Sequence, residues 1–178
     1  EILQLGNIGK EDFSEEAYFD VIRKKTAALF KASSQSGAVS VGAVQEEVMK
    51  AGLLGEMIGI AFQIKDDIFD YFESSELGKP TGNDMLEGKL TLPALYVLNQ
   101  TGDDSLKQTA LKIRSLEASK EEIANFVETV KEKGGIEYAT RMMYEFRDKA
   151  LALVPASADS SLKEALTAYI DYVIERNK

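Results

Sequence analysis

The stretch FQIKDDIFDYF, residues 62–72, places three aspartates in an otherwise apolar segment. The helical periodicity of its surroundings predicts one long helix over about residues 44–72. On such a helix, Asp66 and Asp70 fall about 40° apart, Gln63 shares their face, and Asp67 lies at its edge. Carboxylates one turn apart repel each other, and burial makes them costlier unless a cation compensates their charge.

The residues before the aspartates make this helix apolar nearly all round, which is typical of a buried helix. A solvated acidic face on a surface helix is the alternative interpretation. Gly55 and Gly59 each cost a helix about 1 kcal/mol relative to alanine, and so indicate that another group approaches this face closely. We therefore interpret Asp66, Asp67 and Asp70 as ligands of Mg²⁺, with Mn²⁺ as the alternative, in a site that faces a cavity.

Composition narrows the possible chemistry. The chain has no histidine or cysteine, so it supplies no imidazole base, thiol nucleophile or thiolate zinc site, and a metal must take oxygen ligands. The lack of disulfides agrees with a cytoplasmic location. A formal net charge of −9 disfavours nucleic-acid binding. No run of eighteen apolar residues occurs, so we expect no membrane span.

Helical periodicity continues through the rest of the chain, and no alternating strand pattern stands out. The pattern predicts a single all-α unit over residues 1–178. Ser14 is expected to cap a helix that carries Lys25 and Thr26 and ends before the SSQSG stretch at residues 33–37. Further expected features are a glycine-rich loop at residues 78–89, a helix beginning at Pro93, a capping box at Ser119, a break at Gly134 and Gly135, and a last helix over residues 160–176.

Lysines near the aspartates suit a phosphate-bearing ligand. The glycine-rich loop carries Lys79 and Lys89, but Leu90 follows Lys89, so the loop is not a Walker A motif. Lys25 and Thr26, within IRKKTAALF, form a second polar pair among apolar residues. An ordinary turn-rich loop and a surface lysine are the alternative interpretations of these two features.

Together these segments resemble the trans-polyprenyl diphosphate synthases. FQIKDDIFDY followed by LGKPTGNDMLEGKLTLPAL resembles the second aspartate-rich region of that family, and IRKKTAALF resembles its Lys-Thr helix. EILQL, at the start of the chain, resembles the tail of an earlier family helix. The resemblance implies an all-α helical bundle of the isoprenoid-synthase type around a central cavity. It also implies prenyl transfer, in which isopentenyl diphosphate attacks the cation formed from an allylic prenyl diphosphate and then loses a proton.

The resemblance also assigns roles to single residues. The implied magnesium ligands are Asp66 and Asp70, with Asp67 assisting directly or through water. The implied contacts to the allylic diphosphate are Lys25 and Lys79, and Lys89 and Asp84 match family positions. The residues implied at the reacting centre are Lys25, Thr26 and Gln63. Arg176 and Lys178 match basic residues at the family's C-terminus, with a frayed and solvated end as the alternative.

The family's first aspartate-rich motif lies upstream of the helix that EILQL resembles, and no second DDxxD occurs in the 178 residues. We therefore expect the C-terminal half of a synthase, inactive alone, that forms a homodimer or associates with its N-terminal half. The alternatives are a non-catalytic regulatory or scaffold subunit, a terpene cyclase of the same fold, and an acidic helical interaction module. Magnesium-dependent diphosphate binding separates the enzyme from a scaffold, and product analysis separates elongation from cyclisation.

Overall fold

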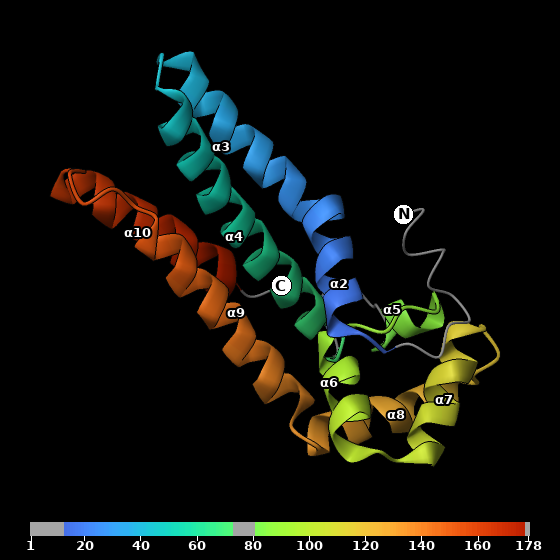
Figure 1. The fold of residues 1–178 in the computed structure, drawn as a ribbon. Coiled ribbons are helices and arrows are strands. Elements are labelled where there is room, and N and C mark those ends of the chain that lie inside the picture. Colours follow the sequence, from blue (N-terminus) through green and yellow to red (C-terminus); the bar gives the residue numbers. More distant parts are fainter. Residues whose placement is uncertain (1–12, 73–80, 177–178) are drawn as a thin grey trace. The chain divides into compact units, whose positions relative to one another are not determined.

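The computed structural model describes residues 13–72 and 81–176, and every regular element in this part of the chain is a helix (Figure 1). This confirms the all-α prediction. No described helix combines the length and the apolar content needed to cross a bilayer. The elements are α2 (Glu15–Ile22), the π-helical turn η1 (Arg23–Ala27), α3 (Ala28–Ser40), α4 (Gln45–Phe69), α5 (Asn83–Leu86), α6 (Leu92–Thr101), α7 (Asp104–Arg114), α8 (Lys120–Glu132), α9 (Gly135–Ala152) and α10 (Ser160–Glu175).

The described residues divide into two compact units. The first contains residues 13–21 and Asp66–Thr140, and the second contains Ile22–Lys65 and residues 141–176. Both α4 and α9 run from one unit into the other, so the aspartate stretch belongs to the first unit and the Lys-Thr segment to the second.

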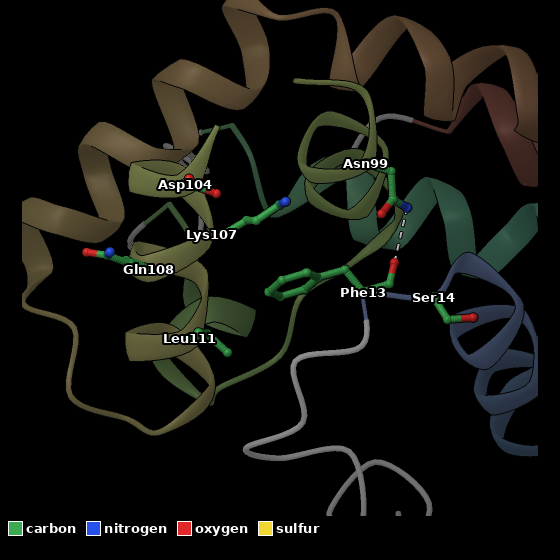
Figure 2. Close-up of a pocket in the computed structure, with 7 residues that line it drawn as sticks. All are labelled: Phe13, Ser14, Asn99, Asp104, Lys107, Gln108 and Leu111. Atoms are coloured by element: carbon green, nitrogen blue, oxygen red, sulfur yellow. Dashed lines mark hydrogen bonds between the residues drawn. The ribbon is translucent and has the colours of Figure 1, made fainter. Parts of the chain in front are cut away.

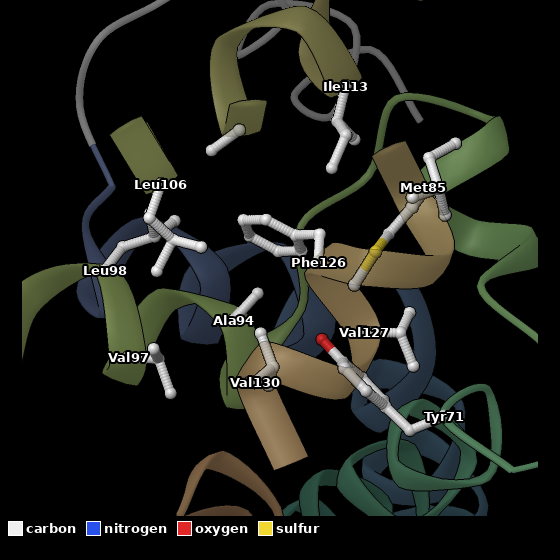
Figure 3. Packing of buried hydrophobic residues seen from close by; sticks show 12 residues of the cluster. Tyr71, Met85, Ala94, Val97, Leu98, Leu106, Ile113, Phe126, Val127 and Val130 are labelled. Atoms are coloured by element: carbon white, nitrogen blue, oxygen red, sulfur yellow. The ribbon is translucent and has the colours of Figure 1, made fainter. Parts of the chain in front are cut away.

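The first unit has a hydrophobic core formed mainly by α6, α7 and α8. The ring of Phe126 points from α8 toward Leu106 and Ile113 of α7 (Figure 3). Tyr71, just after α4, and Met85, within α5, belong to the same cluster, so both elements are attached to this core. The remaining members are Ala94, Val97, Leu98, Ala110, Ile123, Val127 and Val130.

The predicted helix termini are confirmed where local signals define them. Ser14 Oγ accepts a hydrogen bond from the Ala17 amide at 3.2 Å. Ser119 and Glu122 form the complete capping box of α8. Pro93 lies in the first turn of α6, where its missing amide hydrogen costs nothing. Gly134, with φ of 79°, separates α8 from α9 in a conformation that favours glycine.

The predicted helix end before residues 33–37 is wrong. In the second unit α3 continues through this stretch to Ser40. The chain then turns, and α4 runs antiparallel to α3 (Figure 1). SSQSG contains no proline, and one interior glycine costs only about 1 kcal/mol, which is too little to end a helix packed along a neighbour. The long helix was predicted well, since α4 begins at Gln45 and ends at Phe69.

The glycines of α4 face protein backbone. A Cβ atom added at Gly55 would lie 2.4 Å from the Phe30 carbonyl oxygen, and one at Gly59 would lie 2.6 Å from the Ala27 Cα atom. The predicted close approach to this face is therefore confirmed, and the group that approaches is the protein backbone at η1 and α3.

Candidate functional site

Asp67 lies in the first unit with only 5% of its surface exposed. The Tyr18 hydroxyl donates a hydrogen bond to Asp67 Oδ2 at 2.6 Å. Burial, and then the adjacent Asp67 carboxylate, raise the pKa of Tyr18 well above its ordinary value, so the hydroxyl keeps its proton at neutral pH. Asp67 is thus held by a donor that is distant in sequence.

Asp70 follows the last residue of α4, and its carboxylate binds the beginning of α5. Its two oxygens accept the backbone amides of Asn83 and Asp84, each at 3.0 Å, while its carbonyl oxygen accepts the Gly82 amide at 2.8 Å. Gly82 has a φ of 78°, which a side chain would strain. The beginning of α5 is therefore held at the end of α4 by its contacts with Asp70.

These hydrogen bonds affect which aspartate oxygens could bind a metal ion. Within residues 13–72 and 81–176, no group of three carboxylates is arranged to hold a metal ion. Carboxylate oxygens are nevertheless the ligands that Mg²⁺ prefers, and the ion commonly takes one or two of them and keeps several waters. Asp66 is half-buried and fits such a site. Its sequence neighbours already have hydrogen-bond partners, since Asp67 accepts from the Tyr18 hydroxyl and Asp70 accepts from the first amide of α5. The roles of the three remain predictions.

Thr26 and Gln63, predicted to act together, are brought together in the second unit. The Thr26 hydroxyl donates a hydrogen bond to Gln63 Oε1 at 2.6 Å. Thr26 and Lys25 both belong to the π-helical turn η1, in which Lys25 is exposed. Single π-turns inside α-helices are frequent at functional sites.

The remaining predicted cations have different surroundings. Lys89 forms an ion pair with Glu87, and Lys79 lies outside the described residues. The Arg176 guanidinium lies 3.8 Å from the centroid of the Phe62 ring, so this residue is stacked on an aromatic ring and the frayed, solvated end is a wrong interpretation for it. Lys178 is also outside the described part of the chain.

The first unit also contains a pocket of about 580 Å³ (Figure 2). Phe13 points into it, and the Asn99 side-chain amide donates to the Phe13 carbonyl oxygen at 3.1 Å. The other lining residues are Ser14, Asp104, Lys107, Gln108 and Leu111. Among the described residues, none of those predicted to bind diphosphate or metal lines this pocket.

A model of the polyprenyl synthetase family matches residues 1–130. The chain belongs to the polyprenyl synthetase family. An octaprenyl diphosphate synthase of Escherichia coli (strain K12) is 31% identical over 179 residues, which cover 100% of this chain and 55% of that protein. Component 2 of a heptaprenyl diphosphate synthase of Geobacillus stearothermophilus is 35% identical over 174 residues, covering 96% of this chain and 53% of that protein.

Solved structures of polyprenyl synthetases share the fold. The crystal structure of a geranylgeranyl pyrophosphate synthase from Bacteroides thetaiotaomicron has a TM-score of 0.93 and 56% sequence identity, and the match covers 98% of this chain and 58% of that one. The chain thus spans about half the length of the relatives it matches.

Two features of this polyprenyl synthetase chain were missed from the sequence. The π-turn has no sequence signal, because the RKKTA segment reads as ordinary helix. The contact of Tyr18 with Asp67 was not predicted, and only the polar hydroxyl of Tyr18 among apolar neighbours could have indicated a buried hydrogen-bond partner.

The Tyr18→Phe variant should lower the free energy of unfolding by about 1.5 kcal/mol, because it removes a hydrogen bond to a buried carboxylate and leaves the ring in place. Urea denaturation followed by circular dichroism measures the change. Tyr172→Phe is the matched control, since Tyr172 is 72% exposed. Equal midpoints for the two variants would contradict a stabilising role for the Tyr18–Asp67 contact.

Proposed function

We propose that this chain supplies the second aspartate-rich part of a trans-prenyltransferase. The enzyme would condense isopentenyl diphosphate with an allylic prenyl diphosphate to give a longer linear prenyl diphosphate. The observation that carries the proposal is the contact between Thr26 and Gln63, since α4 carries Gln63 one turn before Asp66. An uncharged hydroxyl–amide pair near carboxylates suits a reaction that develops positive charge on carbon.

The direction of the hydrogen bond explains how Thr26 contributes. Because its hydroxyl hydrogen is donated to Gln63, the lone pairs of Thr26 Oγ1 are directed elsewhere and can face a cation. When the allylic carbon–oxygen bond breaks, the electron pair leaves with the diphosphate, whose charge Lys25 and Lys79 would balance. The double bond of isopentenyl diphosphate then forms the new carbon–carbon bond, and loss of a proton restores a double bond.

A metal would assist this step. Mg²⁺, when bound, supplies positive charge that stabilises the departing diphosphate. Asp66 and Asp70 would hold it, Asp67 would assist directly or through water, and Mn²⁺ is the alternative ion. Tyr18 would keep the Asp67 carboxylate in one orientation through its 2.6 Å hydrogen bond. A cytoplasmic location also belongs to the proposal.

Assembly with further chains is a second part of the proposal. The α3–α4 hairpin exposes several apolar side chains, which is typical of a surface that another chain covers. The exposed residues of this kind are Leu29, Val39, Val41, Val44, Met49 and Leu53. A homodimer or a complex with the N-terminal half of a synthase would cover them. The name of the Geobacillus relative, a synthase component, agrees with assembly from more than one chain.

The test is prenyl transfer by this chain with Mg²⁺, labelled isopentenyl diphosphate and farnesyl diphosphate, alone and with the N-terminal half of a family member added. We expect a longer linear diphosphate only in the second mixture. Cyclic hydrocarbon products would indicate a terpene cyclase. Absence of turnover in both, together with no magnesium-dependent diphosphate binding, would favour a regulatory subunit and overturn the proposal.

A further inference from the structure

A buried carboxylate in the second unit lies against the π-turn. Glu56 of α4 is only 7% exposed, and each of its oxygens faces a cation. Arg23 Nε lies 3.0 Å from Oε1, and Lys31 Nζ lies 2.7 Å from Oε2. A carboxylate at this depth is stable only when it is paired, so breaking either contact is costly.

The two cations lie on opposite sides of the π-turn in the sequence. Arg23 is the first residue of η1, and Lys31 follows its last residue, Ala27, by four positions. In a regular α-helix, residues eight apart differ by about 80° in direction after two full turns. A π-turn contains one extra residue without adding its rotation of about 100°, so the difference in direction between Arg23 and Lys31 falls from about 80° to about 20°. Glu56 can therefore bind both cations when the π-turn is present.

The glycines of α4 bring this carboxylate close to the turn. Gly55 precedes Glu56, and Gly59 follows it by less than one helical turn. Their missing side chains allow the Phe30 carbonyl and the Ala27 Cα atom to approach α4 within contact distance. The segment from Arg23 to Lys31 is thus held against α4 by backbone contact in its middle and by ion pairs at its two ends.

The π-turn carries the two residues on which the proposed function depends. We propose that Glu56 is a positioning residue, which keeps η1 in the π-helical register through Arg23 and Lys31 and thereby orients Lys25 and Thr26. Without this carboxylate the segment relaxes to a regular α-helix, and side chains on one side of the turn rotate by about 100° relative to those on the other. The Thr26–Gln63 hydrogen bond is then lost. The structural part of this inference stands alone, while its effect on catalysis rests on the proposed function.

The structural test uses Glu56→Met in the complete chain, because methionine keeps the volume and removes the buried charge. The side chains of Arg23 and Lys31 are 46% and 43% exposed, so water can solvate both cations once the carboxylate is gone, and this variant is expected to fold. A crystal structure should show Arg23–Ala27 as regular α-helix and Thr26 separated from Gln63. Retention of the π-turn and of the 2.6 Å Thr26–Gln63 contact would overturn the inference. Glu47→Gln, which breaks an exposed ion pair with Lys50 on the same helix, is the matched control and should leave η1 unchanged.

Backbone amide exchange provides a second measurement on the same variants. Glu56→Met should speed exchange of the amides around Ala27 and Phe30 at least tenfold relative to wild type, and Glu56→Asp should restore slow exchange in part. Equal protection in all three proteins would overturn the inference whether or not crystals are obtained.

The catalytic readout is the turnover of the reconstituted enzyme. Glu56→Met should lower kcat by 10-fold to 100-fold through Thr26 and raise the KM for the allylic diphosphate through Lys25, while the KM for isopentenyl diphosphate changes little. If the wild type itself shows no turnover, the proposed function fails and the crystallographic result still decides the role of Glu56. An unchanged kcat in an active enzyme would overturn the role of Glu56 in positioning the reacting groups.

Discussion

The Asp66→Asn variant is expected to lose prenyl transfer by about 100-fold or more while keeping its helical content. The amide has the size of the carboxylate but lacks its charge, so it binds a divalent cation poorly. Asp66 is half-buried on α4, where an asparagine costs the helix little. The initial rate at saturating substrate, measured over a range of magnesium concentrations, should show both a lower maximum and a higher magnesium requirement.

Three comparisons give this result its meaning. Glu128→Gln is the control, because Glu128 is exposed and its ion pair is with Lys131, its neighbour on the same helix. Asp67→Asn and Asp70→Asn should lower stability as well as activity, since these residues bind Tyr18 and the beginning of α5. Full activity of Asp66→Asn would remove Asp66 from the proposed metal site.

The Gly55→Ala variant is expected to lower the free energy of unfolding by about 2 kcal/mol. Helix propensity alone favours alanine over glycine by about 1 kcal/mol. The added methyl group, however, would lie 2.4 Å from the Phe30 carbonyl oxygen and 2.5 Å from Ser34 Oγ, so the two helices must move apart. Overpacking of this kind typically costs about 1–3 kcal/mol, and a clash with rigid backbone should cost about 3 kcal/mol. Subtracting the gain of about 1 kcal/mol in helix propensity leaves the net loss of about 2 kcal/mol. The urea midpoint measures the difference.

The chain offers a graded series of controls for this substitution. Gly37 lies inside α3 with nothing within 4 Å of its added Cβ atom, so Gly37→Ala should stabilise the protein slightly. Gly52→Ala should fall between the two, because only the flexible Gln35 side chain lies in the way. If Gly55→Ala unfolds at the same urea concentration as Gly37→Ala, the close packing of α3 on α4 is not a source of stability.

The sequence predicted the parts of this fold that depend on short-range signals. The capping box at Ser119, the proline at the first turn of α6 and the long apolar helix α4 are each encoded within a few residues. The end of α3 was mispredicted because SSQSG is locally permissive, and packing along α4 decides its conformation.

The sequence indicated which residues belong to the candidate site better than it indicated which of them are in contact. Helical spacing placed Asp66 and Gln63 on one face, while only the family resemblance implied Thr26 and Gln63 at the reacting centre, and Thr26 does contact Gln63. The contacts of Tyr18 with Asp67 and of Glu56 with Arg23 join residues that are far apart in sequence, and no periodic pattern encodes them. The π-turn likewise depends on a partner helix that the RKKTA segment does not contain.

The three hydrogen bonds at Asp70 also imply an order of events in folding. A four-residue helix such as α5 is too short to persist in water alone. Three consecutive amides, those of Gly82, Asn83 and Asp84, are held by one residue at the end of α4. The segment from Gly82 through α5 is therefore expected to take its shape only after the end of α4 has formed. Gly82 supplies the backbone freedom that this arrangement needs, since its φ is 78°.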